Sequence, residues 1–420
     1  MQGSPYGLFH IRPDLQSNGE KKHLPGGKME QDMPTHIVRG IMTEFARMTG
    51  LSSTGKVPPR RYLWTDAFAV CNFLELYRQT CDEKWSHLAL RLVEQVHNIL
   101  GRHRDDDSRV GWISGLDEQE GKAHPTMGGL RIGKEMNERR VNDPFDEHLE
   151  WDRDGQYYHY LTKWMHALNR VSRVTGDLNY NIWAMELAKT AYAKFVYFTP
   201  SGGQKRMYWK MSIDLTYPLV TSMGHHDPLD GFITYNQLKA TASKDIENQM
   251  WPDLIEEITE MGKICEAKSW ATDDPLGIGG LLSDAFKVAQ LIVYENFEQT
   301  ELLKKLLDSA LQGLRLYEGR SPLKLPADYR LAFRELGLSI GLRAVEKLHA
   351  LINQNDAHVH KTPALYSRVE SLMRYLQLRD EIEVFWLKRT NREVDTWKEH
   401  LDINMVMLAT SLAPDGYLKL

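Results

Sequence analysis

Paired amphipathic segments recur along this chain of 420 residues and restrict the folds that it can adopt. The first pair covers residues 63–79 and 83–100, and the second covers 155–174 and 180–198. The turns between the partners, Thr80-Cys81-Asp82 and Thr175-Gly176-Asp177, match each other. Apolar residues recur every three or four positions within these segments, whereas the alternation typical of strands is nearly absent. The sequence therefore predicts an all-α protein built from helical hairpins.

Three more hairpins are predicted from the same spacing. The third begins near residue 211, is interrupted by a loop at 224–231, and continues with helices near 232–240 and 246–265. The fourth covers 277–294 and 300–317, and the fifth covers 329–351 and 365–386. Two amphipathic segments, 34–48 and 397–412, lack a neighbouring partner. We expect them to pair with each other as a sixth hairpin that closes the chain into a ring of twelve helices.

The domain organisation follows from this count. Residues 1–33 are predicted to be an N-terminal extension, and 34–420 a single domain. The long segment 102–154 separates the first two hairpins and is rich in Trp and Gly, which favours an ordered, functional loop. We expect it to cover the mouth of the ring.

The hairpin count, the Thr-Gly-Asp turn and the openings Trp64-Thr65-Asp66 and Arg153-Asp154-Gly155-Gln156-Tyr157 resemble those of the six-hairpin (α/α)6 toroids. This group includes many glycoside hydrolases, unsaturated glucuronyl hydrolases and sugar isomerases of the N-acylglucosamine 2-epimerase type. The resemblance implies an active site built from the loops that lead into the inner helices. A right-angled bundle or an α-solenoid is the structural alternative, but solenoid repeats have a near-constant period and the spacers here are irregular.

Composition limits the partners. A net charge of −5 and a pI near 6.4 give no reason to expect nucleic acid. Runs of about 18 apolar residues are absent, so no membrane span is predicted. Three cysteines predict neither a disulfide framework nor a zinc site, and a cytoplasmic location is expected. The sequence gives no oligomeric state.

The Gly277-Ile278-Gly279-Gly280 run lacks a preceding strand and a P-loop pattern, so no cofactor is predicted.

Repeated acids provide the first catalytic candidates. Thr65-Asp66-Ala67-Phe68 returns as Ser283-Asp284-Ala285-Phe286, and elements one and four of a six-hairpin ring face each other. Asp66 and Asp284 are therefore candidates for an acid and base pair across the lumen. The alternative is that Thr65 and Ser283 cap helices whose first turns carry an acid.

A second group of acids, Glu150, Asp152 and Asp154, lies just before the second inner helix. Crowded carboxyl groups raise one another's pKa, as a protonated catalytic acid requires. A capping cluster stabilised by the helix dipole is the structural alternative.

Substrate-binding candidates come from the inner helices and their loops. His159 and Lys163 share one helical face. The 224–231 loop contains His225, His226, Asp227 and Asp230. These four residues are candidates for acid/base groups or sugar ligands, and the alternative is that they form a rigid turn. Adjacent histidines point apart, so no metal is predicted. If this loop lies inside a hairpin, it is on the face opposite the mouth. The remaining binding candidates are Trp64, His124, Arg131, Tyr158, Trp270 and Asp274. Trp270 is expected to stack on a sugar ring. Arg131 and Lys163 are expected to neutralise a substrate carboxylate.

These features favour a glycoside hydrolase that acts on a small or acidic saccharide through carboxylate acid/base catalysis. The 11 Trp and 18 Tyr are consistent with a sugar cleft, although helix packing also uses such rings. A sugar epimerase that transfers protons through histidine is the first alternative, since the chain holds 16 histidines. The second is a non-catalytic helical scaffold, which predicts an open superhelix and no enclosed acids.

Overall fold

The computed structural model describes residues 28–52, 58–199, 202–203, 205–243, 251–266, 268–354 and 363–420, with side chains from residue 34 onward. Residues 1–27 of the predicted extension and 246–250 of the predicted helix 246–265 lie outside these ranges. Residues 28–33 belong to the first helix, α1 (Lys28–Met48).

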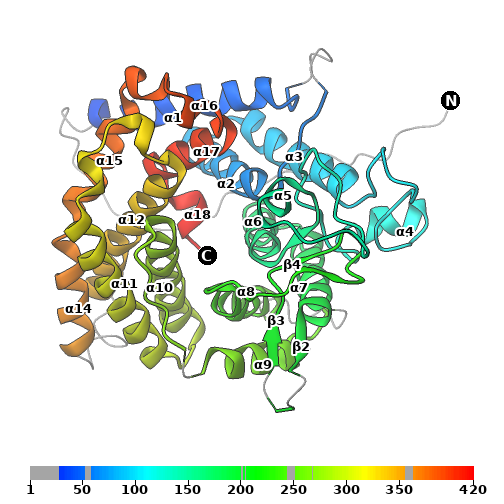
Figure 1. Cartoon of the computed structure of the whole chain (residues 1–420). Coiled ribbons are helices and arrows are strands. Elements are labelled where there is room, and N and C mark those ends of the chain that lie inside the picture. The colour runs from blue at the N-terminus through cyan, green and yellow to red at the C-terminus, as the bar shows by residue number, and fades with distance from the viewer. Residues whose placement is uncertain are drawn as a thin grey trace.

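Six helices form a closed inner ring, in which each packs against the next and the last packs against the first (Figure 1). They are α2 (Leu63–Thr80), α6 (Tyr158–Thr175), α8 (Asp227–Ala242), α10 (Pro275–Glu295), α12 (Ala332–Gln354) and α17 (Leu401–Leu412).

An outer layer of helices covers this ring, and each outer helix packs on the inner helix of its own hairpin. The outer helices are α3 (Glu83–Leu100), α7 (Asn179–Phe195), α9 (Ile255–Cys265), α11 (Thr300–Arg320) and the pair α14 (Pro363–Met373) and α15 (Leu376–Leu387). The sixth outer helix is α1, which packs against α17. The predicted pairing of the N-terminal and C-terminal helices is therefore confirmed, and the described chain is a closed ring rather than an open superhelix.

Local sequence explains the matching turns between hairpin partners. The Thr80 and Thr175 hydroxyls each donate to the carbonyl four residues earlier, and Cys81 and Gly176 adopt the left-handed conformation that ends a helix. The Asp82 carboxylate then accepts from the backbone of the next helix as its N-cap.

Two small sheets depart from the all-helical expectation. Strands β1 (Gln156–Tyr157), β4 (Lys210–Met211) and β5 (Pro218–Val220) form one, and β2 (Val196–Phe198) and β3 (Lys205–Met207) form the other. The prediction of a helix from residue 211 is therefore wrong. The third inner helix begins at Asp227, so the 224–231 loop leads into an inner helix instead of interrupting a hairpin.

The remaining elements are short. Within the insert lie α4 (Glu118–Ala123) and α5 (Glu147–Asp152), and near the C-terminal end lie α16 (Asp395–Lys398) and α18 (Asp415–Leu418). Three 3₁₀ turns, η1 (Pro322–Lys324), η2 (Ala327–Tyr329) and η3 (Arg389–Arg392), join the later helices.

The C-terminal segment enters the ring and closes one end of it (Figure 1). Helix α18 contacts α2, α6 and α10, and Gln290 on α10 donates to the carbonyl of Leu418 at 2.9 Å. The Tyr417 ring stacks on Phe68 with 4.5 Å between centroids. Tyr417 thus forms a floor inside the ring, a role that the sequence analysis did not foresee.

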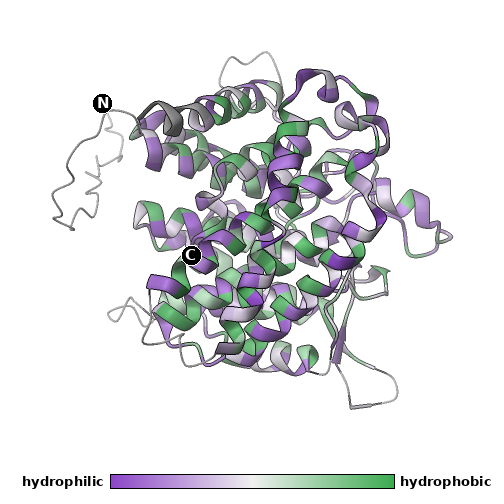
Figure 2. Cartoon of the chain, turned by 90° about the vertical axis from the view of Figure 1, so that its left-hand side faces the viewer, coloured by the Kyte–Doolittle hydropathy of each residue, from purple (hydrophilic) through white to green (hydrophobic). Residues whose placement is uncertain are grey.

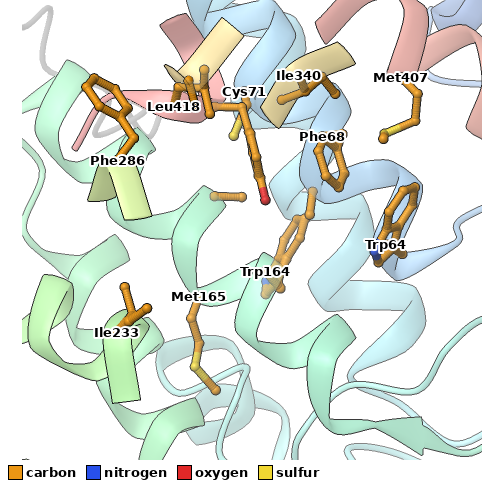
Figure 3. Packing of buried hydrophobic residues seen from close by; sticks show 14 of the residues in the cluster. Trp64, Phe68, Cys71, Trp164, Met165, Ile233, Phe286, Ile340, Met407 and Leu418 are labelled. Carbon is orange, nitrogen blue, oxygen red and sulfur yellow. The ribbon is translucent and has the colours of Figure 1, made fainter. Parts of the chain in front are cut away.

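Every inner helix contributes buried apolar side chains to one continuous core (Figure 3). Most helices carry both hydrophobic and hydrophilic residues, as expected for two concentric layers (Figure 2). Helix α10 alone among the described helices is long and apolar enough to span a membrane. Within the most apolar stretch of this helix, 72% is buried inside the protein. The apolar composition of α10 is therefore that of a core helix.

Helices α10 and α12 cross at glycines. A β-carbon on Gly279 would overlap the Gly337 carbonyl oxygen, and one on Gly341 would overlap the Gly279 backbone. Only residues without a side chain allow these two backbones to approach so closely.

We expect Gly279→Ala to destabilise the fold by about 1–3 kcal/mol, because the new methyl group forces the two helices apart. Gly280→Ala, one position later in the same helix, is the matched control, since a β-carbon there meets nothing within 4 Å. It should be neutral or stabilising by up to about 1 kcal/mol through helix propensity. Denaturant unfolding of both variants measures the difference, and equal stabilities would contradict the close crossing.

Candidate active site

A cavity of about 990 Å³ opens at the end of the ring where the inner helices begin. This volume is at the upper end of the ~300–1,000 Å³ typical of small-molecule sites. Its wall includes at least one side chain from every inner helix: Asp66 on α2, Lys163 on α6, Asp230 on α8, Asp284 on α10, Ile340 on α12 and Met407 on α17. The inner helices therefore point their N-terminal ends, with positive dipole ends, toward one opening.

A buried cluster of charged groups lies deep in this cavity. Lys163 donates to Asp230 at 3.0 Å, a hydrogen bond joins the carboxyl groups of Asp230 and Asp284, and the Lys287 ammonium is 3.6 Å from Asp284. The residues come from three neighbouring inner helices, so the ring itself assembles the cluster.

Burial and neighbouring charges give the two linked carboxyl groups different pKa values. Burial raises the pKa of Asp284, and repulsion from Asp230 adds to it, to about 7. Burial also opposes ionisation of Asp230, but the Lys163 ammonium and the hydrogen bond from Asp284 outweigh it and lower the pKa of Asp230 below its ordinary value. Near neutral pH, Asp230 is ionised and Asp284 can hold the proton that they share.

Asp227 is the third acid and has no hydrogen-bond partner for its Oδ2 atom within the described protein. It is the first residue of α8, one turn before Asp230, and its Oδ1 is 3.7 Å from Nδ1 of His159. Burial, followed by repulsion from Asp230, raises the pKa of Asp227 to about 8. A β-carbon on Gly224 would overlap the Asp227 carboxyl group, so this glycine leaves room for it. The result is a carboxylic acid that is protonated at neutral pH and directed at the cavity.

Aromatic rings form one wall above these acids. Trp209 stacks near His159 at 6.4 Å, with 15° between planes, and it contacts Tyr157 at 5.3 Å and Trp151 at 5.0 Å. The pairing of β1 with β4 brings Tyr157 beside Lys210 and so fixes the position of Trp209. Burial lowers the pKa of His159 to about 4, which keeps its imidazole neutral.

The repeated acids are not equivalent, contrary to the sequence prediction. Tyr62, not Thr65, is the N-cap of α2, and its backbone N–H donates to Asp66. Ser283 is inside α10, nine residues after Asp274, and its hydroxyl donates to a carbonyl in the same helix. Ser283 is therefore no cap, and Asp284 does not start a helix.

Both members of the predicted cross-lumen pair line the cavity, but each has another partner. Asp66 is 3.5 Å from Arg61, and burial raises its pKa to about 6 in spite of that cation. Asp284 pairs with Asp230, an acid that sequence analysis considered within the loop without ranking it among the catalytic candidates.

The acids before the second inner helix do not line the cavity. Asp154 is fully buried between Arg131 and Arg104 at 2.9 and 3.3 Å, and Glu150 is held by Arg139 at 2.7 Å. Asp152 is exposed. These carboxylates hold the insert to the ring, so the prediction of a catalytic acid there is not supported.

Four predicted binding residues also lie away from the cavity. His124 is at the surface with Glu186, Arg131 is occupied by Asp154, and Tyr158 is buried against Tyr235. Trp270 is fully buried and cannot stack on a sugar. Its backbone supports the site indirectly, because the Trp270 carbonyl accepts a hydrogen bond from Nε2 of His226 at 2.9 Å.

The other predicted residues do line the cavity: Trp64, His159, Lys163, His225, His226, Asp227 and Asp274. Lys163 is bound to Asp230, however, and is not free for a substrate carboxylate as predicted. The sequence patterns gave no signal for Trp209 and Tyr417, which lie between the second and third predicted hairpins and after the last predicted helix. From the insert, Gly133, Lys134, Glu135 and Trp151 line the cavity. No group of three or more His, Cys, Asp or Glu among the described residues is arranged to hold a metal ion.

Solved structures with a similar fold include two hydrolases and an epimerase. A family 76 glycoside hydrolase from a bovine Bacteroides thetaiotaomicron strain matches 91% of this chain and 77% of its own, with a TM-score of 0.50 and 11% identity. A GH76 α-mannanase of Bacteroides thetaiotaomicron matches 93% of this chain and 98% of its own, with a TM-score of 0.49 and 8% identity. A sugar epimerase from a ruminal bacterium matches 82% of this chain and 86% of its own, with a TM-score of 0.43 and 9% identity.

The first of these likenesses establishes the architecture: the chain has the six-hairpin (α/α)6 toroid fold. A scan against models of protein families finds no match, and neither does a comparison with curated protein sequences.

The raised pKa of Asp227 predicts a pH-dependent cost to stability. The unfolded chain releases this proton near pH 4 and the folded chain near pH 8, so the stability of the wild type falls as pH rises between these values. Asp227→Asn removes this cost and should stabilise the protein by about 4 kcal/mol at pH 7, with little gain at pH 4. Denaturant unfolding across this pH range measures the difference, and a gain that does not grow with pH would contradict a protonated Asp227.

Proposed function

We propose that this protein is a glycoside hydrolase, with Asp227 as its general acid and Asp230 as the ionised carboxylate that acts as base or nucleophile. The observation that supports this most directly is the separation of pKa values among three neighbouring carboxyl groups. Hydrolysis of a glycosidic bond requires one protonated and one ionised carboxyl group in the same cavity. Asp227 and Asp230 have these states near neutral pH.

The residues take complementary parts in this mechanism. The Asp227 proton is not used within the protein and is available to the oxygen of the leaving sugar. Lys163 keeps Asp230 ionised, and Asp284 stabilises that charge by a hydrogen bond. The wall of Trp209, Tyr157 and Trp151 provides apolar faces of the kind on which sugar rings stack.

A sugar epimerase is the second candidate, and His159 is the observation that favours it. Its neutral imidazole faces the cavity, and Nδ1 has no hydrogen-bond partner within the described protein. A neutral histidine beside a protonated carboxyl group is suited to moving a proton at a sugar carbon. The two candidates predict different products from the same cavity.

A panel of oligosaccharides, uronides and free monosaccharides tests the proposal, with released reducing sugar and proton exchange at C2 both followed by NMR. We expect release without exchange. Asp227→Asn and Asp230→Asn should each lower kcat by about 10²–10⁴-fold, because each removes an acid/base group. Asp152→Asn, at an exposed acid away from the cavity, should retain full activity. Exchange without release would favour the epimerase, and neither signal would refute both candidates.

The pH profile of kcat/KM gives a further prediction. Activity should fall about tenfold per pH unit above about pH 8, because Asp227 must keep its proton to protonate the leaving group. On the acid side, activity should persist below the ordinary range of aspartate because the pKa of Asp230 is lowered. Asp284→Asn removes the titration near pH 7 and should leave the fall above pH 8 in place. A profile that rises through pH 9 would exclude Asp227 as the general acid.

A further inference from the structure

We infer that the saccharide bound in this cavity carries an anionic group, a carboxylate or a sulfate or phosphate ester, and that Lys134 of the insert binds it. This inference rests on the proposed function and specifies its substrate class. It replaces Arg131 and Lys163, the two cations expected from the sequence to neutralise a substrate carboxylate, since internal acids occupy both.

Lys134 lines the cavity, yet no carboxylate in the described protein is within ion-pairing distance of its ammonium group. Its Nζ lies 5.6 Å from the centroid of the Tyr62 ring, which is a cation–π contact. Burial lowers the pKa of Lys134, and the carboxylates of Asp152 and Asp154, which lie beyond ion-pairing distance, offset this cost only in part. The other inward-facing lysine of the wall, Lys163, is bound to Asp230. Lys134 is therefore a half-buried cation of the wall that no ion pair occupies.

Two more basic side chains face the same part of the mouth. Arg334 and His400 line the same cavity as Lys134, and the two cations lower the pKa of His400, in addition to burial and against Glu399. Arg334 binds Asp274 at 2.6 Å through its Nη1 atom, while its Nε is buried without a hydrogen-bond partner. The insert, the start of α12 and the start of α17 thus bring three basic groups to one place.

The floor of the cavity carries positive charge as well. Two ammonium groups, Lys163 and Lys287, lie beside the linked pair of Asp230 and Asp284, of which Asp230 is the ionised member near neutral pH. The six N-terminal helix ends add to this positive potential.

The acids near the mouth are either paired or exposed: Asp274 pairs with Arg334, and Asp402 pairs with Arg60. Glu135 and Glu399 are exposed to solvent, where water screens them. Lys134 is therefore a cation without an ion pair in the wall of the cavity, although the chain as a whole has a net charge of −5. A half-buried cation of this kind attracts the anionic group of a bound sugar.

The experiment measures binding without turnover, in the full-length Asp227→Asn variant. The probes are an oligouronide, the same oligosaccharide after reduction of its carboxyl groups, and a sulfated neutral oligosaccharide of equal length. Calorimetry should give at least tenfold tighter binding for one of the anionic probes than for the reduced one, and the difference should shrink as salt increases. The anionic probe that binds tighter identifies the source of the charge.

Adding Lys134→Ala should abolish this difference while leaving the affinity for the reduced probe within about twofold, and Lys134→Arg should retain most of it. Lys194→Ala is the matched control and should leave the difference unchanged, because Lys194 is an exposed lysine that does not line the cavity. Equal affinity for all probes, or an equal loss of every probe in Lys134→Ala, would overturn the inference. Hydrolysis of neutral saccharides alone would overturn the inference of an anionic substrate and leave the proposed function intact. Selective anion binding without hydrolysis would support that inference and contradict the proposed function.

Discussion

Ring closure between the first and last inner helices is the constraint on which this structure depends. Asn72 of α2 donates to the Val406 carbonyl of α17 at 3.0 Å and accepts from the Thr410 hydroxyl at 2.9 Å. These buried bonds join residues more than 330 positions apart, and the Asn72 amide is satisfied only when both helices are in register. Without closure the cavity would lack one wall, and the acids of α8 and α10 would lie open to water.

Closure also explains why charged groups are buried together. A ring of parallel inner helices places polar first turns around a common space that is too narrow for bulk water to screen each group. Charges there must pair or lose a proton, and both outcomes occur: Lys163 pairs with Asp230, and Asp227 is protonated. The chemistry of the cavity is therefore a consequence of the architecture as much as of the individual residues.

Sequence periodicity predicted the fold well because helices and their turns depend on local residues. The hairpin of α2 and α3 was placed within one residue, from apolar spacing and the Thr80-Cys81-Asp82 turn. The site was predicted less well because contacts across the ring decide it. Nothing near Glu150 in sequence reveals that Arg139 and Lys210 hold it away from the cavity. The Ser-Asp motif at Asp284 suggested a helix start. The true cap of α10 is Asp274, ten residues earlier, and nothing in the motif itself reveals this.

Several buried polar atoms in the cavity wall have no partner within the described protein. Proteins pair most buried polar groups, yet His159 Nδ1, Asp227 Oδ2, Thr65 Oγ1 and Arg61 Nε are all buried without a protein partner, and all four residues line the same space. A helical scaffold that binds partners on an open concave surface has no reason to retain them. A sugar, with donors and acceptors on every side, can satisfy donor and acceptor atoms alike, which is why the arrangement favours a saccharide over an apolar ligand.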